Sequence, residues 1–412
     1  MGAGRAPARC DGPDPHLSLM RDPSAAASHL PALPVIGRPT ELAPDRLADW
    51  DSLTVDRPGG HVLQSLAWAR HRAGAGWRAH FLRFDDGVGV LALVRPWPVV
   101  GGSGAYIPRG PIPAADDPAT TAARLGAVVE WLAGRGVDVV ASDAEIAAST
   151  GYGAMLAALG FHPIEELQPA RHRLSLPLPA GIDEDALSRG VTKSTRQRIR
   201  QAERGGLRVV RFDARAGADP GEGFAVDDAP GALDAALGRA YDLATSTGTR
   251  RGFRLEARTS YVAWWRAAHD AGHLVVLEAR DPGAGDEAVA TLVLYRHGER
   301  LTTAVSGDRA DSRTRHPGVF HLLRWRAIQL ALRAGCEEMD LGGVDVAGAR
   351  DEPKPGDRMA GLYEHKRSFG AAWVELTGAH ERVIDGPGYL AGRATLGAAG
   401  VVRRVRARVG GR

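Results

Sequence analysis

The 412-residue sequence is poor in the residues that build disulfide frameworks, metal clusters and membrane spans. It has only two cysteines, Cys10 and Cys336, and no histidine pair at metal-ligand spacing, so we expect neither a disulfide scaffold nor a metal site. The longest apolar run, residues 88–94, is far shorter than the ~18 residues of a membrane helix. The first residues contain no apolar segment of the signal-peptide type. These absences predict a cytoplasmic protein.

Lysine is also scarce, although the chain is well charged. Lys and Arg total 52 against 49 Asp and Glu, which gives a net charge of +3, and 44% of the residues are hydrophobic. This composition excludes a wholly disordered chain. Only Lys193, Lys354 and Lys366 are lysines, and the other 49 basic residues are arginines. An ammonium is a compact charge that a planar guanidinium does not replace, so a lysine that persists here marks a candidate functional position.

The order of predicted elements repeats once along the chain. Each copy has strands, then an amphipathic helix, a glycine, a short strand, and a second short helix with its strand. The marker glycines, Gly136 and Gly335, are 199 residues apart. The predicted strands are 79–84, 87–94, 137–141, 172–178, 274–278, 288–295, 301–305 and 338–341, and the two main helices are 122–135 and 322–334. This order is that of the acetyltransferase-like (GNAT) fold. It predicts an α+β protein of two tandem GNAT-like domains with mixed, mostly antiparallel sheets.

Composition suggests where these domains begin and end. Residues 1–45 are rich in Pro, Ala and Arg and predict a disordered leader. We expect the first domain over 46–175 and the second over 176–375. The segment 376–412 is expected to be helical and to return to the first domain, ending in a basic tail with Arg403, Arg404, Arg406 and Arg408.

The fold usually binds the pyrophosphate of a coenzyme at a glycine-rich loop before the main helix. In the second copy this loop is Arg315–Phe320, where Phe320 stands at a position that needs a small residue. In the first copy Asp116 and Asp117 would repel a pyrophosphate. We therefore expect no acetyl-coenzyme A and no other cofactor.

A series of short motifs in fixed order resembles the FemABX peptidyltransferases, over roughly residues 60–388. Each motif is weak alone, but the ordered set is specific. The motifs are Leu63-Gln-Ser65 with Trp68 and Gly76-Trp77, Tyr106–Pro111, Gln168-Pro169, Thr192–Gly206, Arg250 with Gly252-Phe253, Met339–Gly343 and Gly361–Gly370.

The resemblance implies two GNAT-like domains and transfer of an amino acid from aminoacyl-tRNA, which is the co-substrate. The acceptor in this family is the side-chain amine of the peptidoglycan stem peptide, on lipid II or on its soluble UDP-linked precursor. Lipid II would bring the protein to the inner face of the plasma membrane. No insertion of the size of the long helical arm of some members is present, so the chain resembles the armless, FemX-like members.

The resemblance also implies site residues. Lys366 matches the lysine at the reaction site, where a fixed ammonium stabilises the oxyanion of acyl transfer. Asp340 either orients the reacting amine or caps a turn, and Tyr363 is either a site residue or a core tyrosine. His365 replaces a usual phenylalanine beside the transferred group.

Cations and a phenol are expected to bind the acceptor and the tRNA. Arg72 and Arg250 match ligands of the precursor diphosphate, with Arg251 as the rival of Arg250. Tyr106 and Arg109 lie on a rigid Pro- and Gly-rich loop. The basic helix carrying Lys193, Arg196, Arg200 and Arg204 is either a tRNA contact or a solvated face.

Two other functions stay open. The same resemblance fits tRNA-dependent amide formation on a natural-product amine, and a degenerate GNAT-like domain could bind anionic ligands without catalysis. The sequence does not fix the transferred amino acid, the acceptor, the position in the bridge, the general base or the oligomeric state.

Overall fold

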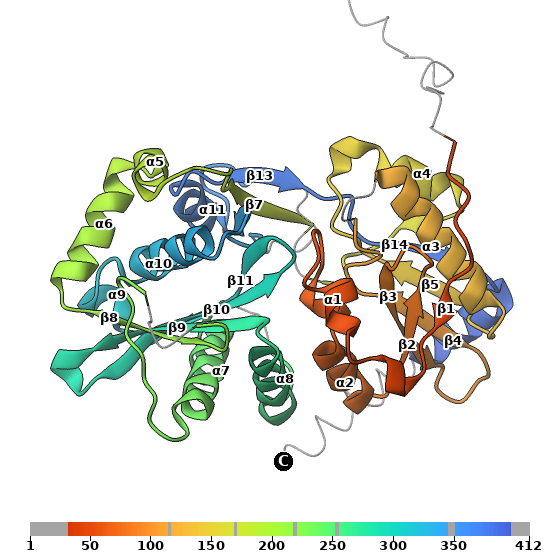
Figure 1. Ribbon diagram of the computed structural model, residues 1–412, viewed down its shortest axis with the longest axis horizontal. Coiled ribbons are helices and arrows are strands. Elements are labelled where there is room, and N and C mark those ends of the chain that lie inside the picture. Colours follow the sequence, from red (N-terminus) through yellow and green to blue (C-terminus); the bar gives the residue numbers. More distant parts are fainter. Residues whose placement is uncertain are drawn as a thin grey trace, which may run out of the picture. The chain divides into compact units, whose positions relative to one another are not determined.

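The computed structural model describes residues 32–113, 117–168, 171–216, 221–251, 255–344 and 351–396. They form two seven-stranded mixed sheets, with strand orders β1-β2-β3-β4-β5-β14-β6 and β13-β7-β12-β11-β10-β9-β8 (Figure 1). The predicted α+β class with a repeated domain is confirmed. No helix within the described residues is both long and apolar enough to cross a bilayer.

The first sheet is built mainly from the N-terminal half of the chain. Its strands are β1 (Thr40–Glu41), β2 (Arg78–Arg83), β3 (Gly89–Pro96), β4 (Ser103–Ile107), β5 (Val139–Ser142), β6 (His162–Pro163) and β14 (His380–Val383). Its helices are α1 (Trp50–Thr54), α2 (Leu66–Gly74), α3 (Pro118–Ala133) and α4 (Tyr152–Ala158). Helix α3 begins earlier than predicted because Asp117 caps it, accepting a hydrogen bond from the Thr120 amide at 2.7 Å.

The second sheet is accompanied by more helices than the first, and several of its strands are longer. Its strands are β7 (His172–Pro177), β8 (Arg208–Asp213), β9 (Leu274–Asp281), β10 (Glu287–His297), β11 (Arg300–Asp308), β12 (Glu338–Asp340) and β13 (Ala372–Glu375). The helices are α5 (Glu184–Gly190), α6 (Lys193–Arg204), α7 (Ala232–Arg251), α8 (Arg258–Asp270), α9 (Ser312–Arg315), α10 (Val319–Arg333) and α11 (Ala360–Arg367). Single 3₁₀ turns occupy Pro44–Arg46, Val62–Gln64, Ala148–Thr150 and Pro282–Ala284.

The two sheets repeat one plan. In the first, β4 pairs in parallel with β5 across the connection that contains α3. In the second, β11 pairs in parallel with β12 across the connection that contains α10. Gly136 and Gly335 end these connections with φ of 73° and 69°, a left-handed conformation that glycine adopts without strain. The repeat predicted from these glycines is therefore the repeated unit of the fold.

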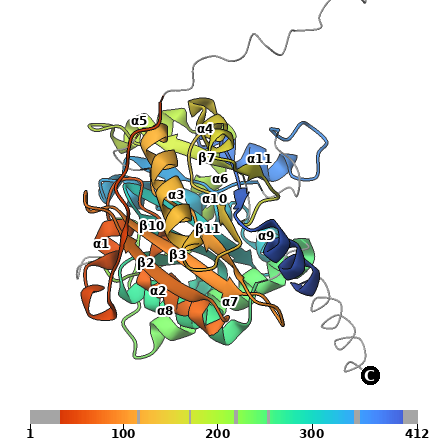
Figure 2. The same cartoon turned by 90° about the vertical axis from the view of Figure 1, so that its right-hand side faces the viewer.

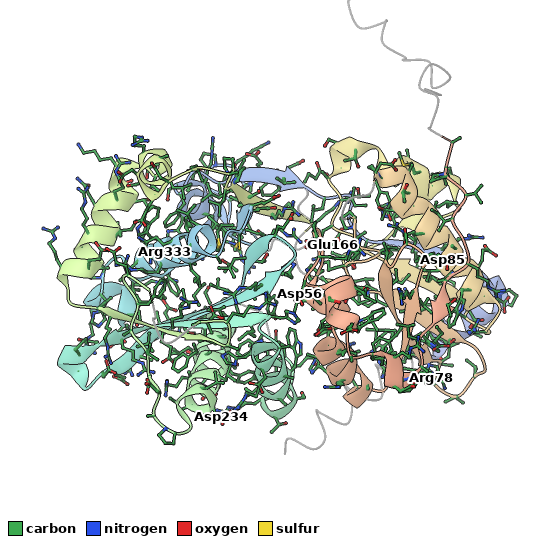
Figure 3. All side chains as sticks on the ribbon, in the orientation of Figure 1. Asp56, Arg78, Asp85, Glu166, Asp234 and Arg333 are labelled. Carbon is green, nitrogen blue, oxygen red and sulfur yellow. The ribbon has the colours of Figure 1, made fainter. Side chains whose placement is uncertain are left out.

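Three apolar cores hold the described residues together. One packs α3 and α4 against the first sheet, and Figure 2 shows α3 crossing this face. A second packs α6 and α10 against the second sheet. The third lies between the sheets and joins Trp50 and Trp68 to Leu237, Trp264 and Trp265. Asp56, labelled in Figure 3, extends the same contact with polar groups. It binds Arg215 at 2.6 Å and His273 at 3.1 Å.

The structure corrects two predicted boundaries. The leader was predicted to reach residue 45, but Thr40 and Glu41 pair with β2, where they satisfy an otherwise open sheet edge. The boundary predicted after residue 175 falls inside β7, whose partners β12 and β13 are both in the second sheet. Beyond residue 375, β14 pairs with β5 and β6, and residues 386–396 are helical. The predicted basic tail lies outside the described residues.

Candidate active site

Strands β11 and β12 separate at the centre of the second sheet. Their parallel pairing spans only Arg300–Thr302 and Glu338–Asp340. Beyond it, β11 continues to Asp308, whereas the segment after β12 turns away from the sheet. The turn uses Gly342 at φ 74°, where an added Cβ would lie 2.9 Å from the Thr303 carbonyl oxygen. A side chain at residue 342 would therefore clash with β11. We call this point of separation between β11 and β12 the wedge.

Lys366 reaches the wedge from α11. Its Nζ donates hydrogen bonds to the carbonyl oxygens of Gly342 and Gly343, at 2.9 and 2.6 Å. The residue is only 5% exposed. Burial and the nearby Arg324 guanidinium lower the pKa of Lys366 to about 7, although Asp340 opposes the shift. Two carbonyls thus fix the ammonium and occupy two of its three donors.

Asp340 ends β12 at the same point. Its Oδ1 accepts a hydrogen bond from the Gly342 amide at 2.7 Å, and Thr302 Oγ1 lies 3.5 Å from Oδ2. Burial and the charge of Glu145 raise the pKa of Asp340 to about 6. The wedge therefore holds a lysine and an aspartate whose pKa values are both shifted toward 7. Groups that exchange protons at neutral pH need pKa values of this kind.

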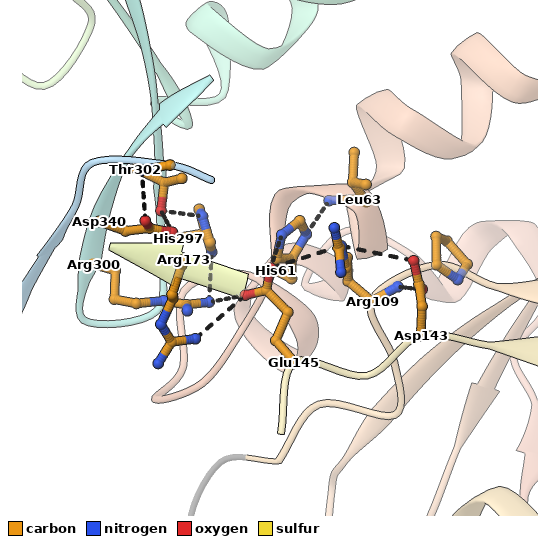
Figure 4. A network of polar contacts seen from close by, with 12 residues as sticks. His61, Leu63, Arg109, Asp143, Glu145, Arg173, His297, Arg300, Thr302 and Asp340 are labelled. Atoms are coloured by element: carbon orange, nitrogen blue, oxygen red, sulfur yellow. Dashed lines mark hydrogen bonds and ion pairs between the residues drawn. The ribbon is translucent and has the colours of Figure 1, made fainter. Parts of the chain in front are cut away.

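A buried ionic network connects the wedge to the first sheet (Figure 4). At its centre Glu145 contacts Arg300 at 2.8 Å, His61 at 3.7 Å, Arg109 at 3.7 Å and Arg173 at 3.8 Å. Burial alone would raise the pKa of Glu145, but the neighbouring guanidinium groups, Arg300 first, hold it well below the ordinary value. The carboxylate stays ionised and binds residues of both sheets.

The predicted residues Tyr106 and Arg109 belong to this network. The Tyr106 hydroxyl donates to Asp143 Oδ2 at 2.9 Å, and the Arg109 amide donates to Asp143 Oδ1 at 2.6 Å. Burial and the Asp143 charge raise the pKa of Tyr106 well above its ordinary value. Both side chains are buried, and Tyr106 lies in β4 rather than on the predicted loop. The two bonds to Asp143 hold β4 and the loop after it close to the end of β5. Contact of Tyr106 or Arg109 with an acceptor stays a prediction.

A cationic cavity of about 860 Å³ opens where α10 begins. Among the described residues its lining contains no carboxylate, and its cations are Arg198, Arg250, Arg313, Arg324 and Arg358, beside His316, His321 and His365. Gly318 precedes the helix at φ 91°, and a Cβ there would lie 2.2 Å from the Arg198 carbonyl oxygen. Glycine thus permits the close approach of α6 to the start of α10, which brings Arg198 to the cavity.

Phe320 does not close this cavity, contrary to our expectation. Its half-buried ring forms part of the wall, with the guanidinium carbons of Arg313 and Arg324 at 5.9 and 5.7 Å from its centroid. The loop before α10 differs from the usual pattern, yet space for a phosphate-bearing group remains. The Asp116 of the first copy lies outside the described residues.

The predicted substrate cations are divided between two places. Arg250 lines the cavity and forms an ion pair with Asp308 at 2.5 Å, and His365 lines it as well. Arg72 lies away from the cavity lining, with its guanidinium 5.4 Å from the ring centroids of both Trp68 and Trp77 and 3.0 Å from Glu256. A diphosphate at Arg72 would have to displace this glutamate.

Tyr363 does not reach the wedge or the cavity lining. Its hydroxyl donates a hydrogen bond to Glu352, and its ring packs edge-on against Trp373 with centroids 5.9 Å apart. Burial and Glu352 raise its pKa. The ring packs in the apolar core of the second sheet, and a catalytic role for Tyr363 stays a prediction.

The basic helix is α6, but its predicted cationic face is not intact. Arg196 is half-buried and donates hydrogen bonds to the carbonyl oxygens of Ser188, at 2.9 Å, and Val191, at the end of α5. Lys193, Arg200 and Arg204 are exposed, because Thr195, Ile199 and Ala202 form the buried face. Contact of these three exposed cations with tRNA stays a prediction.

Sequence reasoning missed most of the cavity and the network. Arg313, Arg324 and Arg358 come from different segments, and no spacing in the sequence links them. Glu145 sits just after the predicted strand 137–141, and its position at a strand end was a signal that could have been used. The Gln64 motif proves structural: Gln64 accepts from the Leu91 amide at 2.7 Å and donates to the Pro108 carbonyl at 2.6 Å.

Comparisons with known proteins agree with this geometry. Residues 191–367 match the acetyltransferase (GNAT) domain family. The matched segment runs from just before α6 to the end of α11, within the second of the two GNAT-like domains. The crystal structure of FemX has a TM-score of 0.68 at 17% identity, covering 86% of this chain and 99% of that one. The chain is therefore FemX-like in fold, which confirms the FemABX resemblance at that level.

Two further solved structures are less similar. L-PGS from Bacillus licheniformis has a TM-score of 0.48 at 10% identity, covering 90% of this chain and 99% of that one. A tandem GNAT protein from the clavulanic acid biosynthesis pathway has 0.42 at 13% identity, covering 84% and 97%. No curated protein matches the sequence.

Proposed function

We propose that this chain is an aminoacyl-tRNA-dependent aminoacyltransferase. It adds an amino acid of the Gly, Ala or Ser class to the side-chain amine of the peptidoglycan stem peptide, on lipid II or on the UDP-linked precursor. The observation that carries the proposal is the placement of Lys366 in the wedge, with Arg324 between it and a cavity lined by arginines. A cationic cavity suits the phosphodiesters of the tRNA acceptor end.

The proposed reaction uses the wedge as follows. The acceptor amine attacks the carbonyl carbon of the aminoacyl ester, a C–N bond forms, and the C–O bond to the tRNA ribose breaks. The amine loses a proton and the ribose oxygen gains one. The Lys366 ammonium stabilises the oxyanion that develops between these steps. Asp340 orients the amine, and its pKa of about 6 leaves it mostly ionised at neutral pH.

The direct test is transfer itself. The purified chain is mixed with a pool of charged tRNAs and either lipid II or the UDP-linked precursor, and the acceptor is weighed by mass spectrometry. The proposal expects a gain of one amino-acid residue that ribonuclease abolishes. Gain only on lipid II would place the enzyme at the inner membrane face. No gain on either acceptor would contradict the peptidoglycan proposal and favour a natural-product amine or a non-catalytic module.

The pH dependence of transfer should report Lys366. Since the ammonium form is the active one, the rate should fall as pH rises through about 7. In Lys366→Arg the guanidinium does not titrate in this range, so whatever rate remains should not fall there. Rates are measured from pH 6 to 9 at saturating substrates. An identical decline in both proteins would assign the titration to another group.

A further inference from the structure

Three side chains at the wall of the cationic cavity form a directed chain of hydrogen bonds. Arg324 Nη1 lies 2.7 Å from His365 Nε2, and His365 Nδ1 lies 3.2 Å from His321 Nε2. The two imidazoles meet edge to face, with centroids 4.3 Å apart. All three residues line the cavity.

The chemistry of these groups fixes the direction of the chain. A guanidinium carries only donors, so His365 Nε2 must accept. The proton of neutral His365 is then on Nδ1, which donates to His321 Nε2. Neutral His321 must in turn carry its proton on Nδ1. Burial and Arg324 lower the pKa of both histidines, that of His321 to about 4, so both rings are neutral at pH 7.

The N–H group at the end of this series of hydrogen bonds has no partner. Within the part of the chain that the structure describes, His321 Nδ1 has no hydrogen-bond acceptor. The charged groups that act on His321 are Arg324 and Arg198, and a guanidinium cannot accept a hydrogen bond. Without a ligand, Arg324 and His365 thus leave an N–H donor on His321, a residue of the cavity lining, with no hydrogen-bond partner among the described residues.

We propose that His321 donates a hydrogen bond to the phosphate-bearing ligand of this cavity, and that His365 is a positioning residue that sets the His321 tautomer. The inference rests on the proposed function, in which the ligand is the tRNA acceptor end. The arginines supply charge, whereas the neutral N–H supplies a single directional contact. The ligand chemistry, phosphate esters on a ribose, is shared by RNA and by coenzyme A, and the experiment separates the two.

Substitutions at residue 365 test the positioning role. Glutamine can accept from Arg324 through its oxygen and donate to His321 through its nitrogen, which reproduces the chain, whereas phenylalanine can do neither. Binding of a minihelix RNA ending in CCA, and separately of coenzyme A, is measured for wild type, His321→Ala, His365→Phe and His365→Gln. Thermal unfolding confirms that each variant is folded.

For the true ligand, His321→Ala and His365→Phe should each weaken binding about three- to tenfold, and His365→Gln should stay within about twofold of wild type. The double variant His321→Ala/His365→Phe should be no weaker than either single one, because the two act as one unit. Equal affinities of the Phe and Gln variants for both probes would overturn the inference.

The transfer assay separates this inference from the proposed function. If the Phe and Gln variants bind alike but wild type still transfers an amino acid, the inference fails and the function stands. If wild type binds coenzyme A in the predicted variant order and does not bind the RNA, the tRNA proposal fails and the histidine chain stands.

Discussion

Replacing Lys366 by methionine should lower the rate of aminoacyl transfer about 10²–10³-fold, which is the usual cost of removing one oxyanion donor. Methionine keeps much of the side-chain volume in this buried position and removes only the ammonium. Single-turnover rates at pH 6.5, where Lys366 is largely protonated, give the effect on chemistry. The affinity for the CCA minihelix should change little, because the lysine is not among the residues that line the cavity.

The matched control is Lys354, which is exposed and donates no side-chain hydrogen bond within the described residues. Lys354→Met removes the same charge from the same domain, and its transfer rate should equal that of wild type. Equal losses in the two variants would show an effect of net charge. An undiminished rate in Lys366→Met, with the protein folded, would remove the lysine from the mechanism.

Replacing Glu145 by glutamine should lower the free energy of unfolding by about 3–5 kcal/mol, the usual effect of breaking a buried ion pair. The side chain is 14% exposed and faces Arg300, Arg109 and Arg173, so the substitution leaves buried cations without their counter-charge. Urea unfolding at pH 7, followed by tryptophan fluorescence, measures the loss. Transfer should fall as well, since Arg300 and the wedge lie on the same strand pair.

Glu130 provides the comparison for a surface pair. It contacts Arg382 at 3.1 Å but is 68% exposed, so Glu130→Gln should cost less than about 1 kcal/mol. The pH dependence gives an independent check. The folded-state pKa of Glu145 is well below its ordinary value of 4.5, so its stabilising contribution is present above that value and is lost as pH falls. The difference between wild type and Glu145→Gln should therefore narrow in acid. A constant difference would contradict the ionic account.

The fold was largely predictable because short local sequence patterns mark both copies of its repeated unit. Glycines at 136 and 335 end helices and start strands, and apolar spacing marks α3 and α10. The edges were less predictable. Strand β1 has only two residues and forms because β2 offers an open edge, a property of the folded sheet that no local pattern carries.

The site was predictable only where one residue stood out. Lys366 was marked by the scarcity of lysine and by its motif, and Asp340 by the glycines that follow it. Arg324 was missed because it is one arginine among 49. What distinguishes it is its hydrogen bond to His365, which is 41 residues away in the sequence. Glu145 was missed because its partner Arg300 belongs to the other sheet, 155 residues away. Long-range contacts of this kind appear only when the chain is folded.

The measurement that tests the central claim most directly is the mass of lipid II and of the UDP-linked precursor after incubation with charged tRNA and either wild type or Lys366→Met. The account predicts that wild type adds one amino-acid residue to one of these acceptors, and that the variant, equally folded, adds at most about one hundredth as much in the same time. An unchanged acceptor mass with folded wild type, or equal gain with both proteins, would contradict it.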